Sequence, residues 1–316
     1  MSAQCHSNSS SLRGLFLYNG HLILIALGTA KAFRIMKCMN TIKQILITND
    51  DGIASPGLHA LAREIEAAGH EVTVAAPNYD ASGVSASLGA ITTERPIAKI
   101  VSEIKGFSGR AYALAAPPAT CVLLAQLGAF ERDFDLVVSG INDGMNTGRS
   151  VLHSGTVGAA LAAQNFGLRG LAVSTARANP IQWQSAAQMA CSLLPSMLSA
   201  ASRIAINLNV PGLKLEEIKG LRWGALAPFN AIRSVVRENG PAHVTLEMQP
   251  PPSPPAADTD LGLTRLGFAA LTSLHAGSEV WSEKIQPNED FNPDLSLPAV
   301  TAGDLLQAAR TYLQTS

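Results

Sequence analysis

A short apolar run that ends in two adjacent carboxylates constrains this chain more than any other feature. Ile45, Leu46 and Ile47 are uncharged aliphatic residues, as in a strand that is buried on both faces of a parallel sheet. Asp50 and Asp51 follow a few residues later. They are therefore predicted to lie at the carboxyl end of that strand, where open α/β sheets bind their ligands.

The residues after this pair predict a helix and then a second strand. Ser55 stands where a helix N-cap is expected, and Pro56 suits the first helical turn. Gly69 suits the helix end, and residues 71–77 (EVTVAAP) read as a strand. The order strand, helix, strand is typical of a doubly wound α/β sheet.

Two interpretations of the adjacent carboxylates are open. Side by side they repel each other, and a hard divalent cation is a common way to relieve that repulsion. Alternatively, Asn, Asp and Gly here form only a turn and a helix entry. Three further segments favour the cation, because each follows a predicted strand or precedes a predicted helix. They offer hydroxyl and amide oxygens for a metal and backbone N–H groups for an anion, and they cover residues 77–88, 139–148 and 153–160.

Four motifs in these segments make the chain similar to a known family. In chain order they are TNDDG (48–52), SGVSAS (82–87), SGINDGMNTG (139–148) and SGTVGAA (154–160). With them the chain resembles the SurE family of metal-dependent 5'/3'-nucleotidases, the survival proteins, from about residue 41 to about residue 274. The resemblance implies a doubly wound, Rossmann-like, mostly parallel sheet with a β-rich C-terminal projection. It also implies the hydrolysis of nucleoside 5'-monophosphates, and of 3'-monophosphates as an extension.

The resemblance assigns roles residue by residue. One divalent cation per subunit, Mn²⁺, Mg²⁺ or Co²⁺, is expected on Asp50, Asp51, Ser82 and Asn142. The phosphate is expected to contact Asn146, Ser154, Gly155 and Thr156. Asp50 and Asp51 are the expected catalytic residues. We expect Asp50 to act as a base for an attacking water, and direct attack by Asp50 is the alternative.

The chain departs from the family pattern in places. Residues 116–122 read APPATCV where GTPADCV is usual, Arg149 and Ser150 replace common acidic residues, and residues 258–261 (DTDL) end in an aliphatic instead of an aromatic. No proposed metal ligand is lost, so these changes bear on substrate preference and turnover. They keep open the alternative of a nucleotide-binding protein with reduced or lost turnover.

Two other classes fit less well. A receiver-type signalling module would need a phosphoacceptor Asp at the end of the third strand, where residues 139–142 (SGIN) have none. A Rossmann dehydrogenase would need a GxGxxG motif after the first strand. The net charge of −1 gives no electrostatic case for binding a nucleic-acid duplex or a membrane surface. Cys5, Cys38, Cys121 and Cys191 show neither metal spacing nor a disulfide framework, which favours a cytoplasmic location.

The ends of the chain read differently from its centre. Residues 1–40 are interpreted as an extension outside the fold, and residues 41–316 as the SurE-like phosphatase domain. The apolar runs near residues 15–17 and 22–27 suit a signal peptide or anchor less well, because Asn19, Gly20 and His21 interrupt them.

Strands at 220–226, 243–249 and 267–274, without helices between them, predict a β-rich appendage over roughly residues 219–275. In the family such a hairpin reaches a neighbouring subunit, so a homodimer or homotetramer is implied. Residues 302–313 read as a surface helix.

Overall fold

The computed structural model describes residues 43–275, apart from 201, 232, 251 and 252, together with two strands nearer the N-terminus. These two strands, β1 (Arg13–Tyr18) and β2 (His21–Ala26), pair with each other in antiparallel fashion. The helix predicted at residues 302–313 lies outside the described residues. No helix in the described part of the chain is both long enough and apolar enough to cross a membrane.

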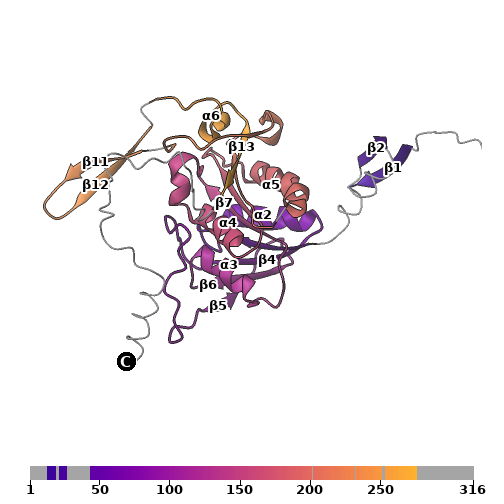
Figure 1. Cartoon of the computed structure of the whole chain (residues 1–316), viewed down its shortest axis with the longest axis horizontal. Helices are drawn as coiled ribbons and strands as arrows, with labels where there is room; N and C mark the ends of the chain where they lie inside the picture. Colours follow the sequence, from indigo (N-terminus) through magenta and orange to yellow (C-terminus); the bar gives the residue numbers. More distant parts are fainter. Residues whose placement is uncertain are drawn as a thin grey trace, which may run out of the picture. The chain divides into compact units, whose positions relative to one another are not determined.

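A nine-stranded sheet lies at the centre of the fold, in the order β10-β13-β9-β8-β7-β3-β4-β6-β5 (Figure 1). Its six inner strands from β9 to β6 are all parallel. At the edges, β5 is antiparallel to β6, and β13 is antiparallel to β9. The strands are β3 (Gln44–Thr48), β4 (Glu71–Pro77), β5 (Lys99–Val101), β6 (Arg110–Leu114), β7 (Leu136–Asp143), β8 (Gly170–Thr175), β9 (Ala205–Val210), β10 (Leu221–Trp223) and β13 (Ala269–Leu274). The predicted α/β class with a mostly parallel sheet is confirmed.

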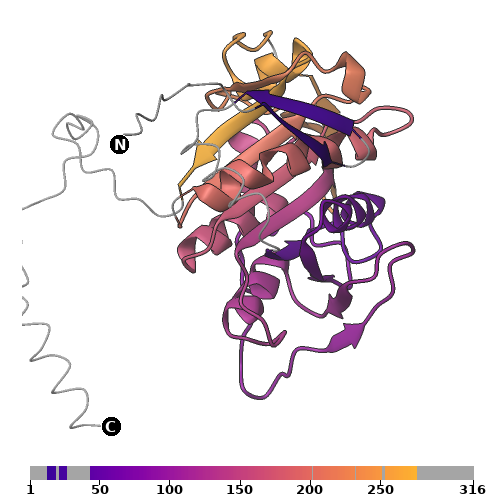
Figure 2. The ribbon, with the colours of Figure 1, turned by 90° about the vertical axis from the view of Figure 1, so that its right-hand side faces the viewer.

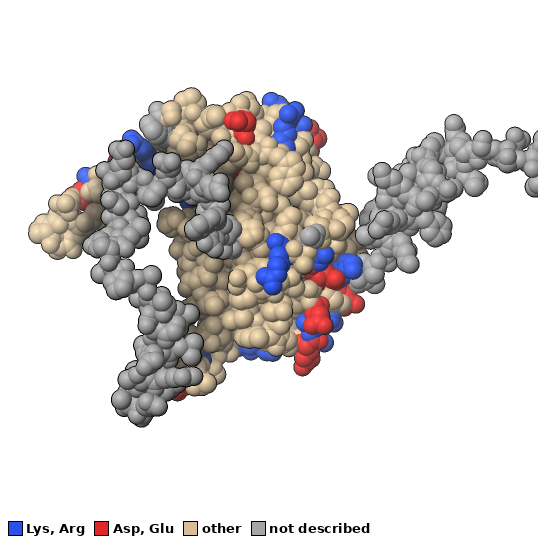
Figure 3. All heavy atoms as spheres, viewed as in Figure 1, with Lys and Arg blue, Asp and Glu red and all other residues tan. Residues whose placement is uncertain are grey.

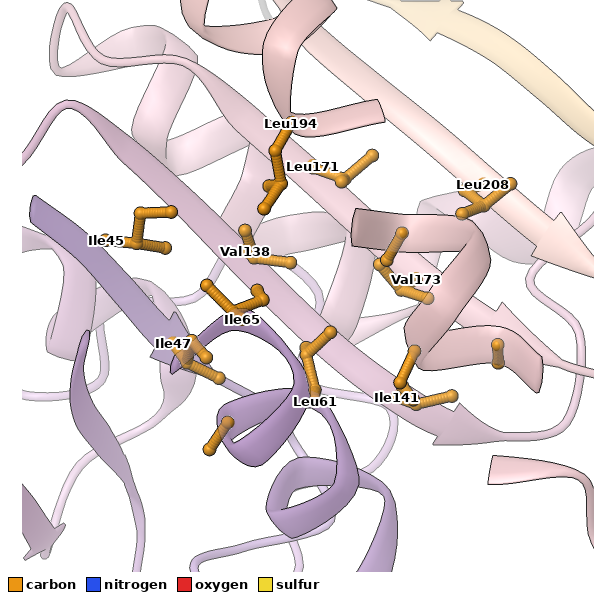
Figure 4. Close-up of a cluster of buried hydrophobic side chains, with 14 of the residues drawn as sticks. Ile45, Ile47, Leu61, Ile65, Val138, Ile141, Leu171, Val173, Leu194 and Leu208 are labelled. Carbon is orange, nitrogen blue, oxygen red and sulfur yellow. The ribbon is translucent and has the colours of Figure 1, made fainter. Parts of the chain in front are cut away.

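Helices cover both faces of this sheet (Figure 2). On one face, α2 (Pro56–Ala67) and α5 (Trp183–Ser199) bury their apolar side chains against Ile45 and Ile47 of β3 (Figure 4). On the other face, α3 (Pro118–Gln126) and α4 (Gly155–Asn165) pack with Leu46. Successive side chains of a strand point to opposite faces. An uncharged strand is therefore needed here, and the sheet is doubly wound.

The local signals around α2 are mostly confirmed. Ser55 occupies the N-cap position with extended backbone, although its side chain makes no capping hydrogen bond. Pro56 begins the helix, and Gly69 follows it with a φ of +90°. This left-handed conformation favours glycine. In α5, Pro195 lies inside the helix, which continues to Ser199.

The β-rich projection is narrower than the sequence predicted. Of the described residues between 219 and 275, only β11 (Arg233–Asn239) and β12 (Val244–Gln249) form a sheet separate from the main one. β10 and β13 belong to the main sheet, and a short helix, α6 (Asp260–Arg265), stands between β12 and β13. The expectation of strands without helices between them was wrong, because one and a half turns of helix are too short to show a 3.6-residue period. Two single-turn 3-10 helices complete the described elements, η1 (Gly148–Leu152) and η2 (Leu215–Glu217).

Candidate active site

The turn after β3 presents the two adjacent carboxylates. Asn49 closes this turn, because its Nδ2 donates to the carbonyl oxygen of Gly52 at 3.0 Å. Gly52 has a φ of +94°, and a Cβ there would lie 3.0 Å from the carbonyl oxygen of Tyr79. Asn49 thus supplies the side-chain hydrogen bond of the turn. The carboxylates of Asp50 and Asp51 are not used in closing the turn and remain available for other contacts.

Asp50 joins three elements at the carboxyl end of the sheet. Its side chain is almost fully buried, and its Oδ1 accepts a hydrogen bond from Oγ1 of Thr156 in the first turn of α4. The same Thr156 Oγ1 lies 3.4 Å from Oδ1 of Asn142 at the end of β7. Sheet order explains the meeting, because β3 lies directly between β7 and β4. A register shift in β7 between Gly140 and Asn142 is a local irregularity of the kind that redirects side chains beside active sites.

The surroundings of both carboxylates disfavour their charged form. Burial raises the pKa of Asp50, against the opposing effect of the Thr156 hydrogen bond. Burial, followed by repulsion from Asp50, Asp80 and Asp143, raises the pKa of Asp51 to about 7. Oδ2 of Asp51 is buried and has no hydrogen-bond partner among the described residues. An unpartnered buried oxygen beside other carboxylates is costly, and a hard divalent cation would offset that cost. The residues present therefore fit such a cation.

The two neutral candidates for the metal come from the loop after β4 and from the end of β7. The backbone N–H of Ala81 donates to the carbonyl oxygen of Asp50 at 2.7 Å, which ties the loop after β4 to the end of β3. Ser82 follows, and its N and Oγ both donate to Oδ1 of Asp80, at 2.9 and 2.6 Å. Nδ2 of Asn142 donates to the carbonyl oxygen of Gly144 at 2.7 Å, so its Oδ1 is turned toward Thr156. Across the described residues no three His, Cys, Asp or Glu side chains gather as a metal site, since the predicted set contains only two carboxylates.

The start of α4 is built closely around Asp50. Ser154 is the N-cap, and its Oγ accepts from the N–H of Val157 at 3.1 Å. At Gly155 a Cβ would lie 2.7 Å from Cβ of Asp50 and 2.8 Å from its Oδ2, so a larger residue would displace the carboxylate. The backbone N–H groups of Gly155 and Thr156 both act on the Asp50 carboxylate and favour its charged form. Amides at a helix N-terminus are also the groups that bind a phosphate.

Asn146 belongs to a neighbouring group of polar side chains. Its N donates to Oδ1 of Asn209 at 2.8 Å, and its Nδ2 donates to Oγ of Ser174 at 2.9 Å. Its carbonyl oxygen accepts from Nδ2 of Asn207 and of Asn209, at 2.8 and 3.0 Å. We call Asn146, Ser174, Asn207 and Asn209 the asparagine cluster, and Asp50, Asp51, Asn142 and Thr156 the carboxylate cluster.

Sequence reasoning missed most of the asparagine cluster. The signal was present in β9, where two amides alternate with apolar residues in the run INLNV, residues 206–210. Both amides are fully buried. In the loop after β4, Asp80 makes turn hydrogen bonds with Ser82. The His153 side chain is exposed, and its carbonyl oxygen accepts from the N–H of Ser85 at 3.2 Å.

A doubly wound sheet with paired carboxylates, an amide and a helix N-terminus meeting at its carboxyl edge defines an α/β protein with a carboxylate-centred candidate site. More specifically, the chain belongs to the SurE family, since residues 45–231 match the family described as Survival protein SurE.

Individual relatives agree with this membership. The chain is 36% identical to the 5'-nucleotidase SurE of Legionella pneumophila strain Paris, over 73% of this chain and 90% of that protein. It is 34% identical to the 5'-nucleotidase SurE of Xanthomonas campestris pv. campestris strain 8004, over 73% of this chain and 89% of that protein. The crystal structure of the SurE protein from Aquifex aeolicus is similar to it with a TM-score of 0.62 and 29% identity, over 73% of this chain and 93% of the Aquifex chain.

Proposed function

We propose that this chain is a hydrolase that cleaves nucleoside 5'-monophosphates, and also 3'-monophosphates, to nucleoside and phosphate with a divalent cation. The observation that carries the proposal is the meeting of Asp50, Asn142 and Thr156, with an unpartnered buried oxygen of Asp51 beside them. Membership of a family whose similar proteins are called 5'-nucleotidase SurE supports the same activity.

The cation would be held by oxygen ligands from three loops. The proposed ligands are Asp50, Asp51, Ser82 and Asn142, and Mn²⁺, Mg²⁺ and Co²⁺ all accept such a set. In the structure the Ser82 hydroxyl donates to Asp80, which leaves the lone pairs of its oxygen for a cation. When bound, the cation would supply positive charge against the phosphoryl oxygens.

The protein's own groups would bind the phosphate and move one proton. The backbone N–H groups of Gly155 and Thr156 stand at the N-terminus of α4, where an anion is favoured. Asn146 and the Ser154 N-cap complete the proposed phosphate contacts. As water attacks phosphorus and the ester P–O bond breaks, the water proton passes to Asp50, and the leaving nucleoside oxygen takes a proton from solvent. Its Oδ1 is already engaged by Thr156, so Oδ2 is the oxygen left for that proton.

Phosphate release tests the proposal directly. With AMP as substrate, the wild type should release phosphate when Mn²⁺ or Mg²⁺ is present and stop when EDTA removes the cation. Asp133→Asn is the matched control, because this exposed carboxylate stands before β7, at the opposite edge of the sheet. A protein that binds AMP and Mn²⁺ but releases no phosphate would contradict the proposed hydrolysis.

Cation binding can be tested without turnover. Calorimetry with Mn²⁺ on the wild type, Asp51→Asn and Asp133→Asn should show a large loss of affinity for the Asp51 variant alone, because a charged ligand is removed. Equal affinity in all three proteins would mean that the cation lies elsewhere. A single turnover with AMP carrying ³²P, quenched in acid, then separates the two routes. Radioactive phosphate bound to the protein supports attack by the Asp50 side chain, whereas release of all the label as free phosphate supports attack by water.

Self-association is proposed for the hairpin β11–β12. Its cross-strand pairs place four apolar side chains on one face, and each is at least 57% exposed: Val236, Val244, Leu246 and Met248. An uncovered apolar face of this kind favours a protein partner, here a second copy in a homodimer or homotetramer. Light scattering should give an oligomer for the wild type and a smaller species for Leu246→Glu. Thr245→Glu adds the same charge to the other face and should keep the oligomer. A strictly monomeric wild type would contradict the proposal.

Other partners are not proposed. On the face shown in Figure 3, Lys and Arg are scattered among uncharged residues and some lie beside Asp and Glu. A nucleic-acid duplex or a charged membrane surface would need a concentrated basic patch. We propose a cytoplasmic location for the chain, in keeping with the free thiols of Cys121 and Cys191.

A further inference from the structure

A second buried carboxylate lies outside the carboxylate cluster. Asp260 is fully buried in the first turn of α6. Its Oδ2 accepts from the N–H of Gly148 at 2.8 Å, and its Oδ1 accepts from the N–H groups of Ala227 and Leu261, at 2.9 and 2.7 Å. The mechanism above does not use this group, although it contacts two backbone segments far apart in the sequence.

The first of these segments is the turn that carries Asn146. Gly148 follows Asn146 by two residues and has a φ of +56°, in the left-handed region. A Cβ at Gly148 would lie 2.1 Å from the carbonyl oxygen of Phe229 and 2.8 Å from that of Ala227. Residues 146–148 are therefore pressed against the backbone of residues 227–229, and only glycine permits this approach.

The second segment leads into the projecting hairpin. The N–H of Asp260 donates to the carbonyl oxygen of Ala225 at 2.8 Å, and the N–H of Ala225 donates to that of Asp258 at 3.2 Å. β11 begins at Arg233, shortly after this segment. We call residues 225–229 the hairpin root. It is fixed to the start of α6 by backbone hydrogen bonds and by one oxygen of the Asp260 carboxylate.

We propose that Asp260 is a positioning residue that holds the turn 146–148 and the hairpin root together as one unit. The carboxylate can do this because both of its oxygens accept hydrogen bonds, one from each segment. An Asn side chain cannot, because its NH₂ group would face a backbone N–H and leave that donor unpaired. The functional part of this proposal rests on the proposed contact between Asn146 and phosphate. A change in the structure of the hairpin root would then alter the position of Asn146 and, with it, the binding of phosphate.

Hydrogen exchange of the full chain tests the physical link. In Asp260→Asn, exchange should accelerate about tenfold or more in both the turn 146–148 and the hairpin root, because one segment loses the acceptor of a buried N–H and the other, held with it as one unit, loosens as well. Thr259→Ala is the matched control, since it removes the α6 cap in which Thr259 Oγ1 accepts from the N–H of Gly262. It should accelerate exchange in α6 and leave the turn 146–148 unchanged. Unchanged exchange at Gly148 in Asp260→Asn would overturn the proposal.

Substrate kinetics separate positioning from general loosening. Asp260→Asn should raise KM for AMP, and the inhibition constant of inorganic phosphate, about tenfold, with a much smaller change in kcat. Thr259→Ala should leave both constants near the wild-type values. The same increase in both variants would mean that α6 acts only through stability, and would overturn the proposal.

A measurement on the wild type keeps the proposal testable if Asp260→Asn does not fold. Inorganic phosphate with Mn²⁺ should slow exchange in the turn 146–148 and, through Asp260, in the hairpin root as well. Slower exchange in the turn alone would overturn the coupling. If the link appears in exchange but the wild type neither binds phosphate nor hydrolyses AMP, the proposed function fails while the role of Asp260 in joining the two segments stands.

Discussion

The carboxylate cluster and the asparagine cluster lie at the same edge of one sheet, yet they are built in opposite ways. In the carboxylate cluster, burial and mutual repulsion raise the pKa of Asp51 to about 7, and its Oδ2 has no partner among the described groups. In the asparagine cluster, the N, O and Nδ2 atoms of Asn146 are all hydrogen-bonded to neutral side chains. The first cluster leaves an oxygen of a carboxylate unpartnered, whereas in the second the unpartnered atom among the described residues is a neutral amide oxygen, Oδ1 of Asn207.

The difference assigns the two clusters different physical tasks. Buried carboxylates that repel each other destabilise the metal-free protein, and a bound cation can remove that repulsion. Such sites commonly trade stability for function. Neutral groups that bond one another fix a backbone turn before any ligand arrives, which lowers the cost of binding. Substitutions in the first cluster should therefore reduce activity without reducing stability, and substitutions in the second should reduce both.

The sharpest test of this contrast is Asp50→Asn. It should lower kcat/KM for AMP about a thousandfold or more, because a charged metal ligand and the proposed base are lost together. The unfolding temperature of the metal-free protein should change little, because the relief of repulsion between Asp50 and Asp51 offsets the loss of a carboxylate acceptor beside the N–H groups of Gly155 and Thr156. Phosphate release and thermal unfolding measure the two outcomes, with Asp133→Asn as the control. A fully active Asp50→Asn protein would end the assignment of the site.

Gly155→Ala should have the next largest effect. The added Cβ would lie 2.7 Å from Cβ of Asp50, so the carboxylate has to move. Displacing a reacting group by about 1 Å costs about a hundredfold in rate. The fold should tolerate the change, because Ala is a good helix former. Steady-state kinetics with AMP should show the loss, and Asn165→Ala, an exposed change at the end of the same helix, should not. Unchanged kinetics would mean that Asp50 is not held in place by contact with Gly155.

Local signals were enough to predict the strand, turn and helix that build the carboxylate cluster. β3, α2 and β4 have apolar periodicity, an N-cap position and a glycine stop within residues 44–77, and the paired carboxylates interrupt this pattern visibly. The family motifs added Asn142 and Thr156, which the structure brings to Asp50.

The remaining features depend on partners far apart in the sequence. Asp260 and Gly148 are 112 residues apart, and Asn207 and Asn146 are 61 apart, so neither bond leaves a local pattern. β13 likewise joins the main sheet only through β9 and β10. Its run AALTSL lacks the β-branched alternation that would mark it as part of a central sheet. Long-range pairing of polar groups is thus the part of this site that sequence patterns do not reveal.

Asn209→Ala tests the asparagine cluster. It removes an acceptor of the Asn146 N–H and a donor to the Asn146 carbonyl, both buried. We expect a loss of about 2–4 kcal/mol in the free energy of unfolding, since two hydrogen bonds are lost and a buried donor is left unpaired. KM for AMP should also rise, because the turn that carries Asn146 loosens. Urea unfolding and kinetics measure both. A stable protein with an unchanged KM would remove the distinction between the clusters, and Asn165→Ala is again the exposed control.

Cys121 can be used to test whether burial alone raises the pKa of a buried group in this fold, or whether charge repulsion contributes as well. Burial raises the pKa of the Cys121 and Cys191 thiols to about 12, and the two lie on opposite faces of the sheet. A thiol with a raised pKa stabilises the fold fully below its unfolded value of about 8.5, and that contribution is lost as the pH rises toward the folded value. Between about pH 8 and about pH 10 the wild type should lose roughly 1–2 kcal/mol more than Cys121→Ala does, by urea unfolding.

The response to Mg²⁺ then decides the cause. If burial alone raises the pKa of Cys121, Mg²⁺ should leave the difference in alkaline stability between the wild type and Cys121→Ala unchanged, and Cys191→Ala should behave in the same way. If Mg²⁺ removed the Cys121 difference but not the Cys191 difference, the charge of the carboxylate cluster would extend to the helices beneath it. The negative charge of the carboxylate cluster would then contribute to the raised pKa of Cys121, and the cation would remove that contribution. The contrast between a charged cluster and an uncharged interior would not hold at Cys121.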